Sequence, residues 1–374
     1  MTWTGLTIMM VFFAGTWQSP WFYHVTEKYD SLLIFISLVF IFFGKVRWTE
    51  KLRQHDRILI VMVLSLAVAV INLFIMNSNK GCILIISDFL LILYMSSEIK
   101  LSKLQMDVMS WFFLIMYFSW FIYDRAFSYN SNTGATFTVF TLMAAMIALK
   151  RLTDRREIYG LFIVMAFLRT GTLVLWHLAR GAFIALTMFI VFYIIFRYRE
   201  LIVRKSGKLA GTYIFLCFFA VFGSLLFVVS YVAASKTGYN LKMPLFYKNV
   251  FSGREQIWQE IWDMLQQHLI TGIGSGYKLK SFFEYNIHNA MYDILAVHGV
   301  IVFAGAAYII IRRLTESGKY ISGVNSKYAR IAGAAIFAIF IESFIDMDLM
   351  WADYSPIIFF LFLEIFYEKH AEKN

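Results

Sequence analysis

The sequence predicts an all-α fold, a polytopic membrane bundle of about twelve transmembrane helices with one long extracytoplasmic loop. Of the 374 residues, 60% are hydrophobic and only 16% are charged, whereas a soluble domain usually carries roughly a quarter charged residues. Apolar runs of about 17–20 residues recur along the chain, and each is long enough to cross a bilayer as a helix. The runs are continuous rather than alternating, which favours helices over the strands of a barrel.

Basic residues gather in short strips between the apolar runs, as at 45–57, 150–156, 197–208 and 312–330. The strips fall on alternate sides of successive spans, which is the positive-inside pattern. The basic residues behind the net charge of +10 are therefore expected to set the orientation of the helices in the membrane rather than to bind nucleic acid. With the strips in the cytoplasm, both termini are cytoplasmic and the expected spans are 2–18, 31–44, 58–76, 81–97, 107–123, 136–149, 158–177, 181–196, 210–233, 290–311, 329–345 and 354–368.

The whole chain, residues 1–374, reads as a single integral membrane domain. Residues 1–15 lack a basic start and a small-residue cleavage site, so they are expected to form the first span. Cys82 and Cys217 both lie inside apolar runs and predict neither a metal nor a redox role. No internal repeat is evident, and this argues against a secondary transporter.

One connection, residues 234–289, is far longer than a link between two helices requires. Within it, residues 254–268 predict an amphipathic helix. Its apolar stripe at helical spacing comprises Ile257, Trp258, Ile261, Trp262, Met264 and Leu265. Such a helix lies on the outer membrane surface or packs over the bundle as a lid. Either arrangement makes the loop a candidate part of an active site.

Polar residues follow this loop at the start of the tenth span. His288 can act as a general base near neutral pH, because the ordinary imidazole pKa is about 6.5. Asn289 and Asp293, with His177 from an earlier span, are candidates for contacting a sugar or orienting the imidazole. The alternative is an interfacial histidine that only caps a helix.

Three arginines are candidate ligands of a diphosphate. Arg180 opens a span at the predicted outer side and Arg254 opens the amphipathic helix; a planar guanidinium can grip two phosphate oxygens at once. Either could instead snorkel or form a salt bridge at a span end. Arg169 lies within a span, where a cation marks a functional site by default; pairing with Glu342 would be a structural explanation.

Two further motifs are discounted. Gly272, Gly274 and Gly276 lack the strand and helix of a dinucleotide site and are read as a flexible turn. Asp346 and Asp348 form a D-x-D pair on a short outer loop, but two carboxylates seldom hold a metal alone. No metal and no cofactor are therefore expected.

The order of these motifs resembles the O-antigen polymerase and O-antigen ligase superfamily. The resemblance covers about residues 160–312 and rests on Arg180-Gly181-Ala182, Gly253-Arg254 with Ile257-Trp258, the glycine-rich turn, and His288-Asn289 with Gly299. It departs from the usual pattern at Ala179, where serine is common, and at Met291-Tyr292, where Tyr-Leu is more usual.

The resemblance implies an inverting, metal-independent glycosyltransferase on the outer face of the bacterial inner membrane. The donor would be a glycan on undecaprenyl diphosphate, and His288 would take the proton of the acceptor hydroxyl. Arg180 and Arg254, with Arg169, would neutralise the leaving diphosphate. Membrane lipid and a polysaccharide chain-length regulator are the other expected partners.

Three functions remain open. The favoured one is a Wzy-type O-antigen polymerase that joins repeat units into a surface polysaccharide. The runner-up is the ligase of the same superfamily, which transfers the finished glycan to lipid A–core. A flippase or exporter of the lipid-linked glycan comes from another class, and it would need neither a long outer loop nor a histidine.

Overall fold

In the computed structural model, the regular secondary structure of the described residues is helical, and the all-α prediction is confirmed. In this part of the chain, β-structure is limited to isolated bridges such as that between Val203 and Leu209. The described residues are 1–76, 78–122, 129–153, 155–237, 242, 246, 250–251, 253–280, 286–323 and 327–371.

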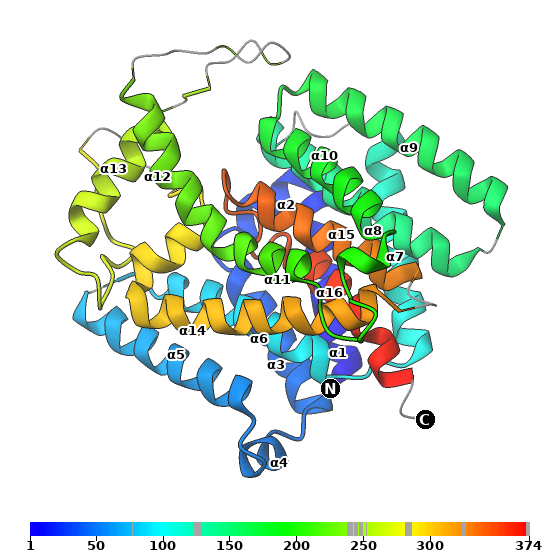
Figure 1. Ribbon diagram of the computed structural model, residues 1–374, viewed down its shortest axis with the longest axis horizontal. Helices are drawn as coiled ribbons and strands as arrows, with labels where there is room; N and C mark the ends of the chain where they lie inside the picture. The colour runs from blue at the N-terminus through cyan, green and yellow to red at the C-terminus, as the bar shows by residue number, and fades with distance from the viewer. Residues whose placement is uncertain are drawn as a thin grey trace.

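The first eight helices, shown from blue to cyan-green in Figure 1, are α1 (Thr2–Gln18), α2 (Pro20–Thr26), α3 (Asp30–Lys45), α4 (Trp48–Arg53), α5 (Arg57–Ile75), α6 (Gly81–Glu98), α7 (Lys103–Ile122) and α8 (Ser131–Leu152). The rest are α9 (Arg156–Trp176), α10 (Arg180–Ile195), the short 3-10 turn Arg199–Leu201, α11 (Gly211–Phe218), a π-helical segment Phe219–Gly223, α12 (Ser224–Ser235), α13 (Arg254–Leu265), α14 (Ala290–Ile321), α15 (Lys327–Glu342) and α16 (Ser355–Ala371).

Every one of the twelve expected spans overlaps a helix. Seven helical stretches of the described chain are both long and apolar enough to cross a membrane: α5, α6, α7, α8, α9, α14 and the continuous run of α11, the π segment and α12. The helix α10 is apolar but shorter. The chain therefore has the helices of an integral membrane protein, while the count of about twelve spans stays a prediction.

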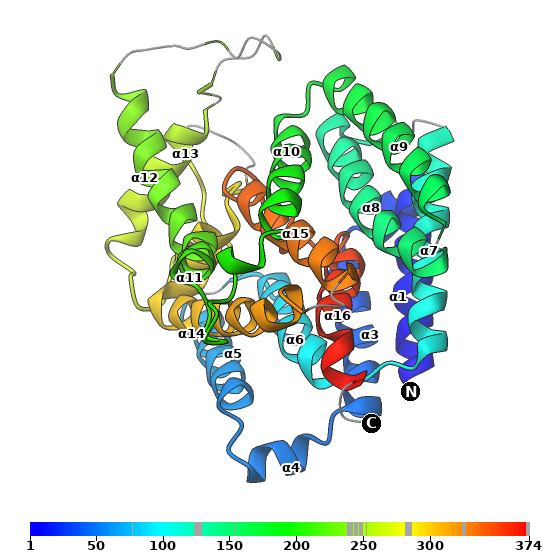
Figure 2. The same cartoon turned by 45° about the vertical axis from the view of Figure 1, so that its right-hand side comes forward.

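The helices α8, α15 and α16 form the centre of the bundle, and α15 and α16 lie inside it in both views (Figures 1 and 2). Alanine and glycine fill much of α15, and small side chains let helix backbones approach closely in lipid. The helix α10 packs on α15 through Ala182 and Ala185, both fully buried. This packing brings the start of α10 against Glu342 at the end of α15.

Charged residues cluster at the end of the bundle where α6 and α16 finish. Glu98 forms ion pairs with Lys51, Arg313 and Lys369, and the Arg313 side chain is only 2% exposed. In a separate pair, Arg151 contacts the buried Glu364 of α16. Several residues of the basic strips therefore form ion pairs that join neighbouring helices inside the protein.

The helix α13 packs against α12 and α14 and buries Ile257, Trp258, Ile261 and Leu265. The predicted stripe faces these two helices except for Trp262, which is 45% exposed, and Met264, which is half-buried. The role of α13 as a lid or as a helix on the membrane surface stays a prediction. The helix ends at Leu265, three residues before the predicted end. Of the predicted loop, residues 238–241, 243–245, 247–249, 252 and 281–285 lie outside the described residues.

A break interrupts α14 at Gly299, which has a φ of 82°. Residues with a side chain rarely adopt this backbone conformation, whereas glycine does so readily. Helical bonding to the carbonyls of Ala296 and Val297 is replaced by the backbone N–H groups of Ile273 and Gly274, at 2.7 and 3.2 Å. The sequence predicts a flexible turn at Gly272–Gly276, but the structure ties this turn to the break. A Cβ at Gly272 would lie 2.4 Å from the Val297 carbonyl oxygen, so glycine is required for the close approach.

Candidate active site

His288 stands immediately before α14 with its backbone in the left-handed region, at φ 53°. A non-glycine residue seldom adopts this conformation, and such strain concentrates at functional sites. The imidazole Nδ1 lies 3.3 Å from Oδ1 of Asp346, in the connection between α15 and α16. The His288 side chain is 23% exposed, so it faces a partly open site rather than the packed core.

Asn289 holds this turn in place. Its side-chain oxygen caps α14 by accepting from the Tyr292 backbone N–H at 2.9 Å and also accepts from the Ser224 hydroxyl at 2.8 Å. Its amide nitrogen donates to the Phe344 carbonyl at 2.9 Å. Asn289 is fully buried, and its amide joins three segments around His288; its predicted role in contacting a sugar or orienting the imidazole stays a prediction.

Arg254 and Arg180 approach the same place from two other helices. Arg254 opens α13 and lies 3.7 Å from Oδ2 of Asp346. Arg180 is the first residue of α10 and donates to the Val250 carbonyl at 3.3 Å. Burial, followed by the positive charge of Arg254, lowers the pKa of Arg180. The starts of α10, α13 and α14 therefore converge, and helix N-termini carry partial positive charge that favours anions.

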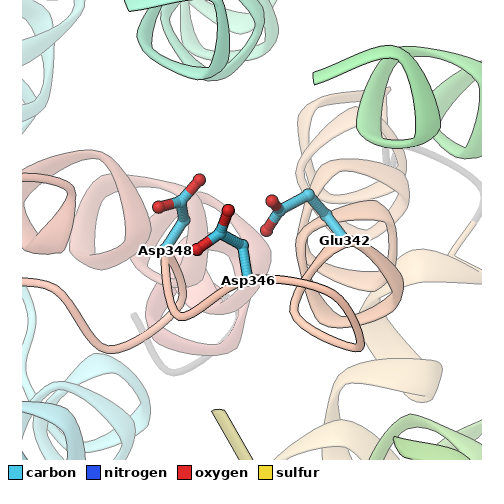
Figure 3. A group of neighbouring side chains, drawn as sticks. All are labelled: Glu342, Asp346 and Asp348. Atoms are coloured by element: carbon cyan, nitrogen blue, oxygen red, sulfur yellow. The ribbon is translucent and has the colours of Figure 1, made fainter. Parts of the chain in front are cut away.

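Figure 3 shows Glu342, Asp346 and Asp348 pointing toward one another. One carboxylate oxygen of each lies within 4.8 Å of the other two, so the group could hold a divalent cation. Both oxygens of Asp346 also face side chains of the protein, Oδ1 toward the imidazole of His288 and Oδ2 toward the guanidinium of Arg254. Metal-independent chemistry at this site stays a prediction.

The electrostatics of the two aspartates differ. Burial favours the neutral form of Asp346, but the hydrogen bond and charge of His288, together with Arg254, hold the pKa of Asp346 below its ordinary value. Burial, followed by the negative charge of Asp346, raises the pKa of Asp348 well above its ordinary value. The site therefore favours the ionised form of Asp346 beside His288 and the neutral form of Asp348.

The remaining predicted residues lie at different distances from this centre. His177 is buried at the end of α9, three residues before Arg180. Asp293 lies one turn into α14 and lines a polar cavity. Arg169 donates from Nε to the Phe121 carbonyl in α7 at 3.1 Å, and the described residues show no ion pair between Arg169 and Glu342.

Sequence reasoning missed the roles of Asp346 and Glu342 at this centre. Asp346 was visible only as half of a D-x-D pair, and its proximity to His288 depends on two connections that are 58 residues apart. Glu342 was considered only as a partner of Arg169. A useful signal was their shared side of the membrane, because both flank the short loop expected outside.

An apolar cavity of about 560 Å³ lies beside the site, between α12, α13 and α14. Val228, Trp258 and Leu295 are among its lining residues, and Lys236 and Gln259 supply polar groups. The Trp258 indole donates to the Ile287 carbonyl at 2.6 Å, next to His288. One aromatic residue thus joins the apolar cavity to the turn that carries His288.

The sequence model of the O-antigen ligase family matches residues 162–307. No match was found among curated proteins or among solved structures. The match runs from α9 to the middle of α14 and includes Arg180, Arg254 and His288. It supports a role in surface polysaccharide assembly as a ligase or polymerase. The match to the O-antigen ligase family over residues 162–307 confirms the resemblance of this part of the chain to the O-antigen polymerase and ligase superfamily.

Proposed function

We propose that this protein is an O-antigen polymerase that joins oligosaccharide repeat units carried on undecaprenyl diphosphate at the outer face of the bacterial inner membrane. The observation that carries the proposal is the meeting of His288, Arg254 and Asp346 within 3.3–3.7 Å, with Arg180 beside them. A base, an anion that orients it and two cations are the groups that transfer from a sugar diphosphate requires.

In the proposed reaction the acceptor hydroxyl oxygen attacks the anomeric carbon of the donor sugar. The bond from that carbon to the diphosphate oxygen breaks, and attack from the opposite face inverts the configuration. The hydroxyl proton passes to Nε2 of His288, while Asp346 holds Nδ1 and stabilises the imidazolium that forms. Undecaprenyl diphosphate leaves with its electron pair, and its developing charge faces Arg254, Arg180 and the helix N-termini.

The apolar cavity between α12, α13 and α14 supports a lipid-linked donor. Its lining is almost wholly hydrophobic, and it reaches the His288 turn through Trp258. We assign it to the first isoprenoid units of the donor, because the diphosphate next to them would then lie near Arg254 at the start of α13. The prediction that Arg169 also binds the diphosphate stays open to test, and the contact with Phe121 gives it a structural role.

The ligase is retained as a second candidate, because the family that matches residues 162–307 is described as O-antigen ligase. The two reactions share a donor, a base and a leaving group, and only the acceptor differs. A flippase or exporter would have no use for the paired His288 and Asp346.

The test uses purified full-length protein in nanodiscs with undecaprenyl-diphosphate-linked repeat units, and products are resolved as a ladder on a gel. A chelator is present in parallel reactions. We expect a ladder that His288→Ala abolishes and that His268→Ala, an exposed histidine of the same loop, preserves. Product formed only after lipid A–core is added would identify the ligase instead. Transport unaffected by His288→Ala, without any product, would identify a carrier, and loss of the ladder with chelator would overturn the metal-independent mechanism.

A further inference from the structure

A second cavity, polar and smaller, lies on another face of α14. Its volume is about 280 Å³, and it is enclosed by the start of α6, the glycine-rich turn and the first half of α14. Its polar lining comprises Asn79, Ser275, Tyr277, Asn286, Asp293 and His298. Pockets for drug-sized ligands begin at about 300 Å³, so this one has room for a single sugar ring rather than an oligosaccharide.

Two groups in this cavity have no protein partner for their side chains. Across the described residues, no donor is found for the Asp293 carboxylate and no hydrogen bond to the His298 ring. His298 is only 3% exposed, and Asp293 is half-buried. Both side chains line the cavity and are available to a ligand that supplies donors and acceptors.

The rest of the lining is held rigidly. The Ser275 backbone N–H donates to the Ser78 hydroxyl at 3.2 Å, and the Asn79 backbone N–H donates to the Ser275 hydroxyl at 2.9 Å. Burial, followed by the charge of Asp293, raises the pKa of Tyr277, so its phenol remains a hydrogen-bond donor. Amides, hydroxyls, a phenol and a carboxylate are the groups that bind sugar hydroxyls, each of which is both donor and acceptor.

The position of the cavity connects it to His288. Asn286 precedes His288 by two residues, and Met347, which also lines the cavity, follows Asp346 directly. On the same half of α14, Tyr292 and Leu295 line the apolar cavity, whereas Asp293 and Val297 line the polar one. The helix start that carries His288 therefore stands between a lipid-like and a sugar-like environment.

We propose that the polar cavity binds the terminal sugar of the acceptor glycan, with Asp293 accepting from its hydroxyl groups. This inference rests on the proposed function, and it places donor lipid and acceptor sugar on two faces of one half-helix. A hydroxyl of the bound sugar then faces His288 from the side opposite the donor tail, as in-line attack requires. The loop between α5 and α6 becomes part of acceptor recognition.

The chain provides a native probe, because Cys82 lines the cavity whereas Cys217 is fully buried. Full-length protein in nanodiscs is treated with iodoacetamide, and modification of Cys82 is followed by mass spectrometry. The added ligand is the repeat-unit oligosaccharide released from the cell's own surface polysaccharide, with maltotetraose as the unrelated sugar. We expect the repeat unit to slow modification of Cys82 at least about fivefold, maltotetraose to leave it unchanged, and Asp293→Asn to remove the protection.

A kinetic measurement complements the probe. Asp293→Asn should raise the KM for the acceptor about tenfold and leave the KM for the donor unchanged, because one charged hydrogen bond is lost from one substrate only. Asp263→Asn, an exposed carboxylate on α13, is the matched control and should change neither.

The outcomes separate the two proposals. Protection of Cys82 in protein that forms no ladder would keep the sugar site and overturn the polymerase. A ladder without protection would overturn the sugar site and leave the polymerase standing. Equal protection by maltotetraose, or protection by a divalent cation alone, would also overturn the assignment to the acceptor sugar.

Discussion

Replacing Asp346 by asparagine keeps the shape of the side chain and removes its charge. The Nδ1–Oδ1 distance of 3.3 Å corresponds to about 5 kcal/mol between unit charges at an effective dielectric constant of about 20. Both side chains are more than a fifth exposed, so solvent screens part of this interaction. We therefore expect a loss of about 3–4 kcal/mol in the transition state, which is about 10²–10³ in kcat.

The assay is single-turnover formation of the first glycosidic bond, measured from the gel ladder across pH. Removing the anion disfavours the protonated imidazole, so the acidic limb of the pH–rate profile should move to lower pH in Asp346→Asn. A structural role alone would lower the rate without moving that limb. The donor KM should change little, because Arg254 is retained.

Asp348→Asn is the matched control from the same connection. Burial and the charge of Asp346 favour the neutral form of Asp348, and an amide resembles that form closely. Its rate should stay within about threefold of the wild type, below about 0.7 kcal/mol. The assignment of Asp346 as the orienting anion would be refuted if both variants lost the same activity, or if Asp346→Asn kept the wild-type rate.

Three further predictions concern binding and stability. Arg254→Ala should lower kcat/KM for the lipid-linked donor by about 10²–10³, with Arg254→Lys in between, because lysine restores charge without the planar fork; steady-state kinetics with varied donor checks this. Gly299→Ala should lower the melting temperature in detergent, since its Cβ would lie 2.1 Å from the Ile270 carbonyl oxygen, whereas Gly171→Ala meets no atom within 4 Å and should be neutral or slightly stabilising. Burial raises the pKa of Asp353 to about 7, so the folded protein keeps this proton at pH values where the unfolded chain, with a pKa near 3.8, has released it. The free energy of unfolding should therefore fall as the pH rises from about 3.8 to about 7. Melting curves of Asp353→Asn should lack that part of the fall, and an unchanged pH dependence would contradict the assignment.

The helical framework could be predicted because lipid imposes it on local sequence. Each apolar run became a helix, and the 3.6-residue period of Ile257, Trp258, Ile261 and Leu265 located the buried face of α13. The number of crossings was less accessible, because α1, α3, α15 and α16 are short or carry charges near their ends. Length and hydropathy alone did not identify these helices as spans.

The site could be predicted only in part. His288, Arg180 and Arg254 could be identified because charged or titratable groups next to apolar runs are candidates for a functional role. Their partners could not, since Asp346 and the polar cavity depend on contacts between segments distant in sequence. The break at Gly299 was hidden for the same reason: one glycine in an apolar run is ordinary, and only the carbonyl of Ile270 beside it shows why no other residue fits.

The broken helix α14 also has a consequence for biosynthesis. The groups that bond to its displaced carbonyls, Ile273 and Gly274 on the glycine-rich turn and Asn72 on α5, all precede α14 in the chain. These donors are synthesised before α14. They can therefore bond to the carbonyls of Ala296, Val297 and His298 when the second half of α14 enters the membrane. These donors satisfy carbonyls that would each cost several kcal/mol if they were left unpaired in lipid. The order of synthesis thus supplies the donors that the broken backbone of α14 requires.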